Sequence, residues 1–203
     1  MVDRPLIMRR EFESVRAHLL AGEVVAVPTD TVYGLCVALR VTGTTEPLFK
    51  KKQRPVSLAV PVMVADLPGA LELCDDRSRE ALQRVGEKFW PGALTLVVYR
   101  GVRCSFDLGG DRSTIGLRVP DLACLRDLCR LVGPLGVTSA NLHGGPPCTT
   151  TGELTKAFGS GLVILDGGRC AGAVSSVIDL TGATPVVLRE GAVSLEMVLD
   201  ALG

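Results

Sequence analysis

Two kinds of hydrophobic spacing alternate along this chain, one typical of helices and the other typical of strands. Met8, Phe12, Val15 and Leu19 recur at steps of four, three and four residues, which predicts one face of an amphipathic helix. Gly22 follows the last of them, and glycine commonly ends a helix. The chain therefore begins with a predicted helix that leads directly into the first apolar run.

Residues 24–39, with the sequence VVAVPTDTVYGLCVAL, are the most informative stretch of the chain. Four apolar residues precede Pro28, and proline ends sheet pairing because it has no N–H to donate. Polar side chains follow before apolar sequence resumes, so we interpret the stretch as a buried strand that delivers hydroxyl groups to a surface. Whether Thr29 or Thr31 contacts a ligand stays open, since alternate residues of a strand share a face.

The rest of the sequence predicts strands and helices in mixed order. Strands are expected at residues 57–64, 94–99, 114–119, 135–138, 162–165, 174–180 and 185–189. Helices are expected from Thr44 or Thr45 to Arg54, at 78–89, after an Asp121 cap through Val132, at 151–158, and after a Ser194 cap. This mixture indicates an α/β fold: one domain over residues 1–203 in which helices flank a twisted mixed sheet.

Charge and hydropathy narrow the classes of function. The 203 residues carry 22 basic and 22 acidic side chains, and this balance argues against nucleic-acid binding by bulk electrostatics, although a local basic patch stays open. The apolar runs are shorter than the roughly 18 residues that a membrane span needs. The N-terminus also lacks the apolar block of a signal peptide. We expect a cytoplasmic protein without membrane association, and a mitochondrial location stays open.

Cysteine and histidine usage predicts neither a zinc site nor a histidine-based mechanism. The seven cysteines are irregularly spaced without a CxxC pair, and there are two histidines, so we interpret the cysteines as reduced core residues. The GxxxxGK[ST], GxGxxG, GxSxG and HExxH motifs are missing from the sequence. Any nucleotide chemistry must therefore use a different scaffold.

Polar side chains gather where the predicted strands begin or end. In an open α/β sheet such ends converge on a ligand, and arginine suits bidentate contacts with phosphate or carboxylate groups. We therefore expect a concave pocket for a phosphorylated or carboxylated small molecule. The residues in these positions, besides those of the 24–39 stretch, are Lys52, Arg54, Thr114, Arg118, Ser139, Asn141, Ser175, Ser176 and Arg189.

Each of these signals also has a purely structural interpretation. The basic run at 50–54 is commonly a solvated helix end, where cations favour the negative end of the dipole. Ser139 and Asn141 are frequent turn residues, and Arg118 fits a surface ion pair equally well. Trp90, before Pro91 and Gly92, is a packing anchor rather than a stacking platform. Composition and spacing alone leave these alternatives open.

The order of eight short blocks, however, resembles a known family. The chain is similar to the YrdC-type threonylcarbamoyl-adenylate synthases of tRNA modification, and the likeness covers residues 24–193. Eight ordered blocks are much more specific than any single motif. They are PTDTVYGL from Pro28, KQRP from Lys52, WPGALTLV from Trp90, IGLRVPD from Ile115, TSAN from Thr138, DGG from Asp166, SSVIDL from Ser175 and LREG from Leu188.

The resemblance implies a YrdC-like fold and a nucleotidyltransferase. Such an enzyme joins L-threonine, bicarbonate and ATP into threonylcarbamoyl-AMP and releases pyrophosphate. A separate tRNA threonylcarbamoyl transferase then uses the product to form N6-threonylcarbamoyladenosine at position 37 of tRNA. The resemblance also implies Mg²⁺ with ATP and no zinc or organic cofactor, and it leaves open a weak contact with tRNA or double-stranded RNA.

Roles carry over only onto matching residues. No side chain is assigned as a general acid or base, and the resemblance implies positioning by Lys52, Arg54 and Ser139. The implied ATP contacts are Lys52, Arg54, Thr114, Asn141, Thr149 and Arg189. The implied threonine contacts are Thr31, Tyr33, Arg118, Ser139 and Ser175.

The sequence departs from the family pattern in a few places. Two residues are missing after Arg54 and Pro55, which shifts a strand expected to wall the threonine pocket, and Ser176 replaces the usual threonine. The C-terminal domain of longer synthases is not expected. Two other functions remain as alternatives: an RNA-binding module of the same fold with weak or no catalysis, and a carbamoyl-adenylate-forming relative that does not depend on threonine.

Overall fold

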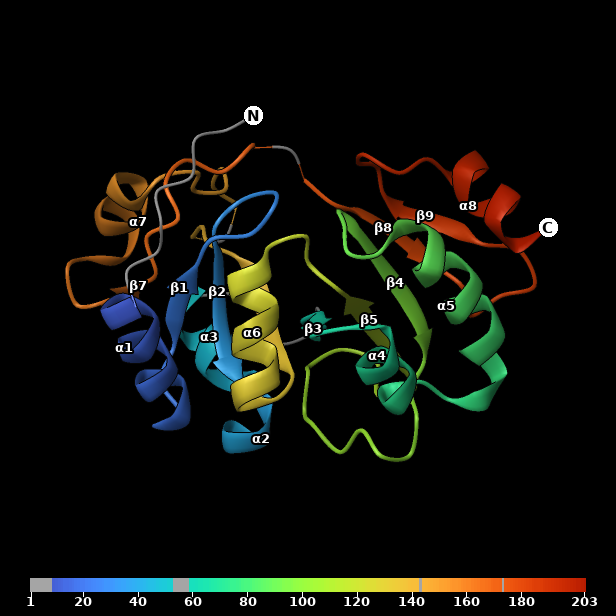
Figure 1. The fold of residues 1–203 in the computed structure, drawn as a ribbon, viewed down its shortest axis with the longest axis horizontal. Helices are drawn as coiled ribbons and strands as arrows, with labels where there is room; N and C mark the ends of the chain where they lie inside the picture. Colours follow the sequence, from blue (N-terminus) through green and yellow to red (C-terminus); the bar gives the residue numbers. More distant parts are fainter. Residues whose placement is uncertain (1–8, 53–58, 143, 173) are drawn as a thin grey trace.

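One mixed sheet runs through the whole structure (Figure 1). The computed structural model describes residues 9–52, 59–142, 144–172 and 174–203, and within them the strand order is β7-β1-β2-β6-β3-β5-β4-β8-β9. The strands are β1 (Val25–Val27), β2 (Gly34–Ala38), β3 (Val62–Met63), β4 (Leu94–Tyr99), β5 (Thr114–Arg118), β6 (Leu135–Ser139), β7 (Val163–Ile164), β8 (Ser176–Asp179) and β9 (Val186–Arg189). The helices are α1 (Arg9–Leu20), α2 (Leu39–Thr42), α3 (Glu46–Lys52), α4 (Leu67–Leu73), α5 (Asp76–Phe89), α6 (Ala123–Val132), α7 (Thr151–Phe158) and α8 (Leu195–Leu202).

The strands pair in both directions. β1 is antiparallel to β2 and parallel to β7, while β4 is antiparallel to β5 and parallel to β8. The two-residue strand β3 joins the two halves of the sheet, since it pairs antiparallel with β6 and parallel with β5. The predicted α/β fold with a mixed sheet and flanking helices is confirmed.

The first half of the sheet, which consists of β7, β1, β2 and β6, is covered by helices on both faces. Because side chains alternate across a strand, Leu35 and Val37 of β2 enter one hydrophobic cluster, whereas Cys36 and Ala38 enter another. The first cluster includes side chains of α3 and α7, and the second includes side chains of α1 and α6. This half, at the left of Figure 1, is therefore a closed three-layer structure.

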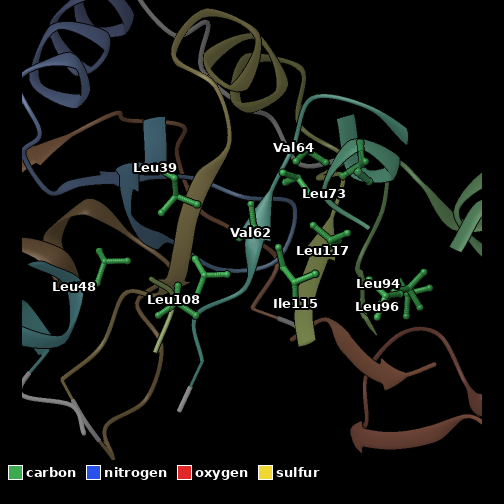
Figure 2. Close-up of a cluster of buried hydrophobic side chains, with 14 of the residues drawn as sticks. Leu39, Leu48, Val62, Val64, Leu73, Leu94, Leu96, Leu108, Ile115 and Leu117 are labelled. Carbon is green, nitrogen blue, oxygen red and sulfur yellow. The ribbon is translucent and has the colours of Figure 1, made fainter. Parts of the chain in front are cut away.

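The second half of the sheet buries one face and leaves the other open to a cavity. Leu94 and Leu96 of β4 belong to a hydrophobic cluster that includes side chains of β5, α5 and α8. Figure 2 shows both leucines near Ile115 and Leu117 of β5. Thr95 and Val97, the alternate residues of the same strand, line a cavity on the opposite face. The alternation along one strand thus separates the core from a candidate site.

Several boundary signals are confirmed. β1 ends at Val27, directly before Pro28. Gly22 follows α1 with a φ of 80°, a conformation that glycine adopts without strain. The Ser194 side chain accepts a hydrogen bond from the Met197 N–H at the start of α8, as expected for a helix cap. Glycine, proline and serine have local conformational effects that a sequence reveals directly.

The strand predicted before Pro28 is present as β1, but the prediction lacked the second strand of this stretch, β2. The stretch forms two antiparallel strands, β1 and β2, joined by a turn. Thr29 Oγ1 stabilises this turn because it accepts hydrogen bonds from the N–H groups of Thr31 and Val32 and donates one to the Val32 carbonyl oxygen. Polar residues that look like a strand end therefore form the connection of a hairpin.

Other element predictions need correction as well. Leu122 rather than Asp121 is the N-cap of α6, and the Asp121 carboxylate lies 3.6 Å from the Arg126 guanidinium. Of the strand expected at residues 57–64, the described part contains only β3 as a named strand, and residues 57 and 58 lie outside the described residues. Helix α4, which Asp66 caps, is absent from the prediction.

The cysteines belong mostly to the interior. Six of the seven are buried, and across the described chain no disulfide joins any two of them. Burial raises the pKa of the Cys129 thiol to about 12, which keeps it protonated at neutral pH. Among the described residues, no helix is both long enough and apolar enough to cross a membrane.

Two glycines provide a matched test of the packing beside β8. A Cβ on Gly191 would lie 2.3 Å from the Ser176 backbone nitrogen, whereas a Cβ on Gly152 in α7 would meet nothing within 4 Å. We expect Gly191→Ala to lower the free energy of unfolding by about 1–3 kcal/mol through overpacking. Gly152→Ala should leave it unchanged or raise it by up to about 1 kcal/mol. Urea denaturation of both variants checks this, and equal stabilities would contradict the close approach at Gly191.

Candidate ligand-binding site

A cavity of about 460 Å³ lies on the open face of the sheet. Its walls come from the hairpin turn after β1, from strands β4, β5 and β6, and from the β8 and β9 region. Strand ends that are distant in sequence thus converge on one hollow, as expected. The predicted site residues that line it are Thr31, Tyr33, Thr114, Arg118, Ser139, Ser175 and Arg189.

Strand register arranges four side chains in a row across the floor of this cavity. Leu96 is opposite Leu117, so the next positions of β4 and β5 are Thr95 and Arg118. Thr95 is aligned with Val177 of β8, and Val177 with Arg189 of β9. Laterally aligned residues share a face of the sheet. Two arginines therefore stand at the ends of a row whose centre is Thr95 and Val177.

A β-bulge brings Arg189 into this row. Ile178 is opposite Val187 and Val177 is opposite Arg189, so Leu188 is an extra residue in β9. In a regular ladder without the bulge, Leu188 would be opposite Val177, and Arg189 would face the other side of the sheet. The bulge thus changes the face of the sheet on which this cation lies.

Arg118 is a buried cation held from two sides. Its side chain is 5% exposed, and its Nη2 lies 2.7 Å from Asp30 Oδ1 in the turn between β1 and β2. Its Nε donates a second hydrogen bond, 3.0 Å long, to the Gly92 carbonyl oxygen. The ion pair is buried, not on the surface, and it leaves part of the guanidinium fork available at the cavity.

Arg189 is held by Ser175. Its Nε donates to the Ser175 carbonyl oxygen at 2.8 Å, and its Nη2 donates to Ser175 Oγ at 2.7 Å. Partial burial, and then the positive charge of Arg118, lower the pKa of Arg189 from its ordinary value. Two cations that repel each other across one cavity favour an anionic ligand between them.

Thr29 and Thr31, the two threonines of the hairpin turn, differ in how much hydrogen-bonding capacity they have left for a ligand. Thr29 Oγ1 donates its one proton to the Val32 carbonyl oxygen at 2.6 Å, so in the 2.8 Å contact with Thr31 Oγ1 the proton comes from Thr31. Thr31 Oγ1 then keeps its lone pairs available to accept a hydrogen bond from a ligand. Both side chains line the cavity, but Thr29 is occupied by the turn.

Lys52 is buried at the edge of the cavity. Its Nζ donates to Asn141 Oδ1 at 3.0 Å, to Thr138 Oγ1 at 3.3 Å, and to the carbonyl oxygen of Ser139. Ser139 Oγ in turn donates to Asn141 Oδ1 at 2.6 Å. Lys52 is therefore part of a network with two predicted site residues and not a solvated helix end.

Two other predicted residues, Tyr33 and Thr149, have hydroxyl groups that are engaged by other parts of the protein. The Tyr33 hydroxyl is engaged with the 166–168 loop, since it donates to the Gly168 carbonyl oxygen at 2.8 Å and accepts from the Gly167 N–H at 3.1 Å. Burial raises the pKa of Tyr33 above its ordinary value. Thr149 is not among the lining residues, and its hydroxyl contacts Glu153 and Arg169. Arg54 lies outside the described residues.

Sequence reasoning assigned no role to three polar groups of the site. Thr95 was the lone polar position within the strand-like LTLVVY segment, which was a usable signal. Asp111 lines the cavity from the long loop before β5, and hydrogen bonds from the Ser113 N–H and hydroxyl lower the pKa of its carboxyl group. Asp30 stood within the PTDTVYGL block, but only the fold reveals its pairing with Arg118.

The described residues offer little for a protein-bound metal ion. Across this part of the chain, no group of three or more histidine, cysteine, aspartate or glutamate side chains is arranged to hold one.

Trp90 serves packing: its Nε1 donates to the Leu94 carbonyl oxygen at 2.7 Å, and its ring lies against Gly86. The polar part of the cavity lining therefore consists of cations and hydroxyl groups together with the Asp111 carboxylate.

Comparison with known proteins gives consistent relatives. A family model for Sua5, YciO and YrdC proteins, described as "Telomere recombination", matches residues 17–191. A putative threonylcarbamoyl-AMP synthase of Mycobacterium tuberculosis is 37% identical over 199 residues, which cover 96% of this chain and 90% of that protein.

Solved structures agree with the sequence relatives. Sua5 of Pyrococcus abyssi, in complex with L-threonine, superposes with a TM-score of 0.84 at 31% identity, covering 95% of this chain. This chain spans only 57% of that longer protein. Escherichia coli YciO superposes with a TM-score of 0.80 at 26% identity, covering 94% of each chain. The chain therefore belongs to the Sua5/YciO/YrdC family.

Proposed function

We propose that this protein is a threonylcarbamoyl-AMP synthase, which joins L-threonine, bicarbonate and ATP and releases pyrophosphate. The observation that carries the proposal is the convergence of Arg118, Arg189 and the Lys52 network around a single cavity. Three cations with hydroxyl groups between them suit a substrate set that consists of a carboxylate, bicarbonate and a triphosphate. The threonylcarbamoyl-AMP synthase named among the relatives supports the same reaction.

The amino acid is assigned to the part of the cavity between Arg118 and Ser175. The free part of the Arg118 fork and the Ser175 hydroxyl are donors for the α-carboxylate, because Ser175 Oγ accepts from Arg189 and keeps its own proton. Thr31 Oγ1 presents lone pairs suited to the amine of threonine. Tyr33 and Ser139 complete this group as wall residues.

ATP is assigned to the other cations of the site. Lys52, Arg54 and Arg189 are the cations for the phosphate oxygens, and Thr114 and Asn141 are polar contacts beside them. Thr149 belongs to this group by resemblance alone, since its hydroxyl contacts Glu153 and Arg169. Charge-assisted contacts of this kind stabilise the negative charge that develops on departing pyrophosphate.

The chemistry is largely a matter of positioning. The amine nitrogen of threonine forms a bond to the bicarbonate carbon, water leaves, and one oxygen of the resulting carbamate attacks the α-phosphorus while the bond to pyrophosphate breaks. Alignment of reactants in one cavity supplies much of the rate for such steps. Neither step needs a covalent enzyme intermediate, and we assign no side chain as a general acid or base.

Mg²⁺ enters this proposal with ATP rather than as a resident metal. Magnesium is commonly held by substrate phosphates together with one or two carboxylates, and it neutralises phosphate charge. Asp111 is the carboxylate that fits this role, since it lines the cavity and its pKa is lowered. The product would then be consumed by a separate transferase that modifies tRNA, in the compartment where tRNA is modified.

Product formation from labelled bicarbonate tests the proposed function directly. With ATP, Mg²⁺ and L-threonine, we expect label to enter threonylcarbamoyl-AMP, and omission of any one substrate should abolish the signal. Mass spectrometry of the acidified or rapidly filtered mixture detects the product. Adenylate formation that is independent of threonine would indicate a carbamoyl-adenylate-forming enzyme instead. No consumption of ATP under any condition would overturn the proposal.

Arg118→Lys tests the threonine side of the assignment. Lysine keeps the charge but loses the fork that contacts Asp30 and the carboxylate together, so the KM for threonine should rise by about tenfold or more. The KM for ATP should change much less. The matched control is Arg126→Lys, because Arg126 contacts Asp121 and the Pro120 carbonyl oxygen away from the cavity lining. An equal rise in the KM for threonine in both variants would contradict the assignment.

Asn141→Ala tests the ATP side. The Asn141 side chain accepts from Lys52 Nζ and Ser139 Oγ, so its removal releases the lysine that is assigned to phosphate. We expect kcat/KM for ATP to fall about 100-fold, the size of loss that a small misplacement of a positioning group causes. Leu142→Ala, at an exposed neighbouring residue, is the control. Full activity of Asn141→Ala in steady-state kinetics would refute this role.

A further inference from the structure

Thr95 is a buried hydroxyl residue that the reaction scheme above does not use. It is 4% exposed and lies in a strand whose other buried residues, Leu94, Leu96 and Val98, are apolar. Within the part of the chain that the structure describes, its hydroxyl has no hydrogen-bond partner. Because no protein group is bonded to this hydroxyl, a valine would serve the fold at least as well at this position.

The hydroxyl of Thr95 is open to the cavity. Among the described residues, the one side-chain polar atom that is both sealed from solvent and without a partner is Nε of Arg16, so the Thr95 oxygen is not sealed. The Thr95 methyl group is turned toward Gly116, because Cγ2 would lie 3.4 Å from a Cβ built there. With the methyl group packed against β5, the remaining exposure of this residue belongs to the cavity that it lines.

The position of Thr95 relates it to the amino-acid end of the site. It lies between Arg118 on β5 and Val177 on β8 in the row described above, and Ser176 of β8 is aligned with the preceding residue, Leu94. Arg118 and Ser175, the donors assigned to the carboxylate, therefore flank it on either side. A substrate carboxylate held by these two groups would place its neighbouring carbon atoms over Thr95.

We propose that the Thr95 hydroxyl hydrogen-bonds to the side-chain hydroxyl of the amino-acid substrate and so selects a β-hydroxy amino acid. This inference rests on the proposed function and adds the residue that determines its amino-acid specificity. The substrate carboxylate is bound by the stronger donors, among them the charged Arg118 guanidinium. The neutral Thr95 hydroxyl is then available for the neutral side-chain hydroxyl of the substrate. Of the other hydroxyl groups that line the cavity, those of Thr31, Ser139 and Ser175 already have protein partners, and Thr114 is assigned to ATP.

A pocket that hydrogen-bonds a substrate hydroxyl rejects an analogue without it, because the protein hydroxyl then loses its partner. L-2-aminobutyrate is the appropriate analogue, since it has a hydrogen atom where threonine has its hydroxyl. The ratio of kcat/KM for threonine to kcat/KM for this analogue therefore measures the contact. A purely structural role of Thr95 would change both values together and leave the ratio as it is.

The experiment compares Thr95→Val, Thr95→Ser and Thr95→Cys with the unaltered protein in a pyrophosphate-release assay with each amino acid. Valine keeps the shape of threonine without the hydroxyl, so the ratio should fall roughly tenfold, the size expected for one hydrogen bond. Nearly all of this fall should come from a lower kcat/KM for threonine, with kcat/KM for L-2-aminobutyrate almost unchanged. Serine keeps the hydroxyl and should preserve the ratio, whereas cysteine, a weak hydrogen-bonding group, should lower it. Thr155→Val, on the surface of α7, controls for a threonine-to-valine change elsewhere.

The outcomes separate this inference from the proposed function. If the unaltered protein uses threonine but Thr95→Val keeps the same ratio, or loses both substrates equally, the inference is overturned and the proposed function stands. If the unaltered protein forms product with neither amino acid, the proposed function is overturned and the inference with it. Should Thr95→Val fail to fold, an unchanged ratio in Thr95→Cys is the result that rejects the contact.

Discussion

The ion pair between Arg118 and Asp30 joins the two halves of the sheet at the site. Arg118 ends β5 in the half that has an open face, and Asp30 belongs to the hairpin turn of the half that is covered on both faces. A buried pair contributes little net stability when it is intact, but loss of one partner leaves an uncompensated charge in the interior. The pair therefore fixes the relative positions of the turn that contributes Thr31 and the strand that contributes the cation.

The site is built from hydroxyl groups whose protons and lone pairs are largely assigned before any ligand arrives. Thr29 is saturated by its own turn, Ser139 donates to Asn141, and Ser175 accepts from Arg189. Each of these contacts orients a neighbour that faces the cavity, so the free donors and acceptors point inward at fixed places. Such preorganisation suits a reaction whose barrier is lowered by alignment, because little reorganisation is left for the moment of reaction.

Local sequence signals predicted the elements well, and long-range pairing limited the prediction. Pro28 and Ser194 act on their own backbone, so their effects on β1 and α8 were visible without a fold. The cavity residues at strand ends could also be anticipated, and seven of the expected site residues do line one cavity. The hairpin within residues 24–39, however, depends on the pairing of β1 with β2. The bulge at Leu188 likewise depends on the register of β9 with β8. To identify Thr95 as a site residue, one needs both the alternation of side chains along β4 and knowledge of which face of the sheet is open.

The bulge in β9 makes strand register, as well as residue type, a determinant of the site. Leu188 is exposed, and the bulge at this residue decides that Arg189 and not Leu188 is opposite Val177. If the same chain paired regularly, Leu188 would take that place and Arg189 would turn to the far face of the sheet, whereas deletion of Leu188 would keep Arg189 opposite Val177. Within this family fold, a one-residue register shift in an edge strand can thus alter charge in the cavity while every functional side chain remains in the sequence.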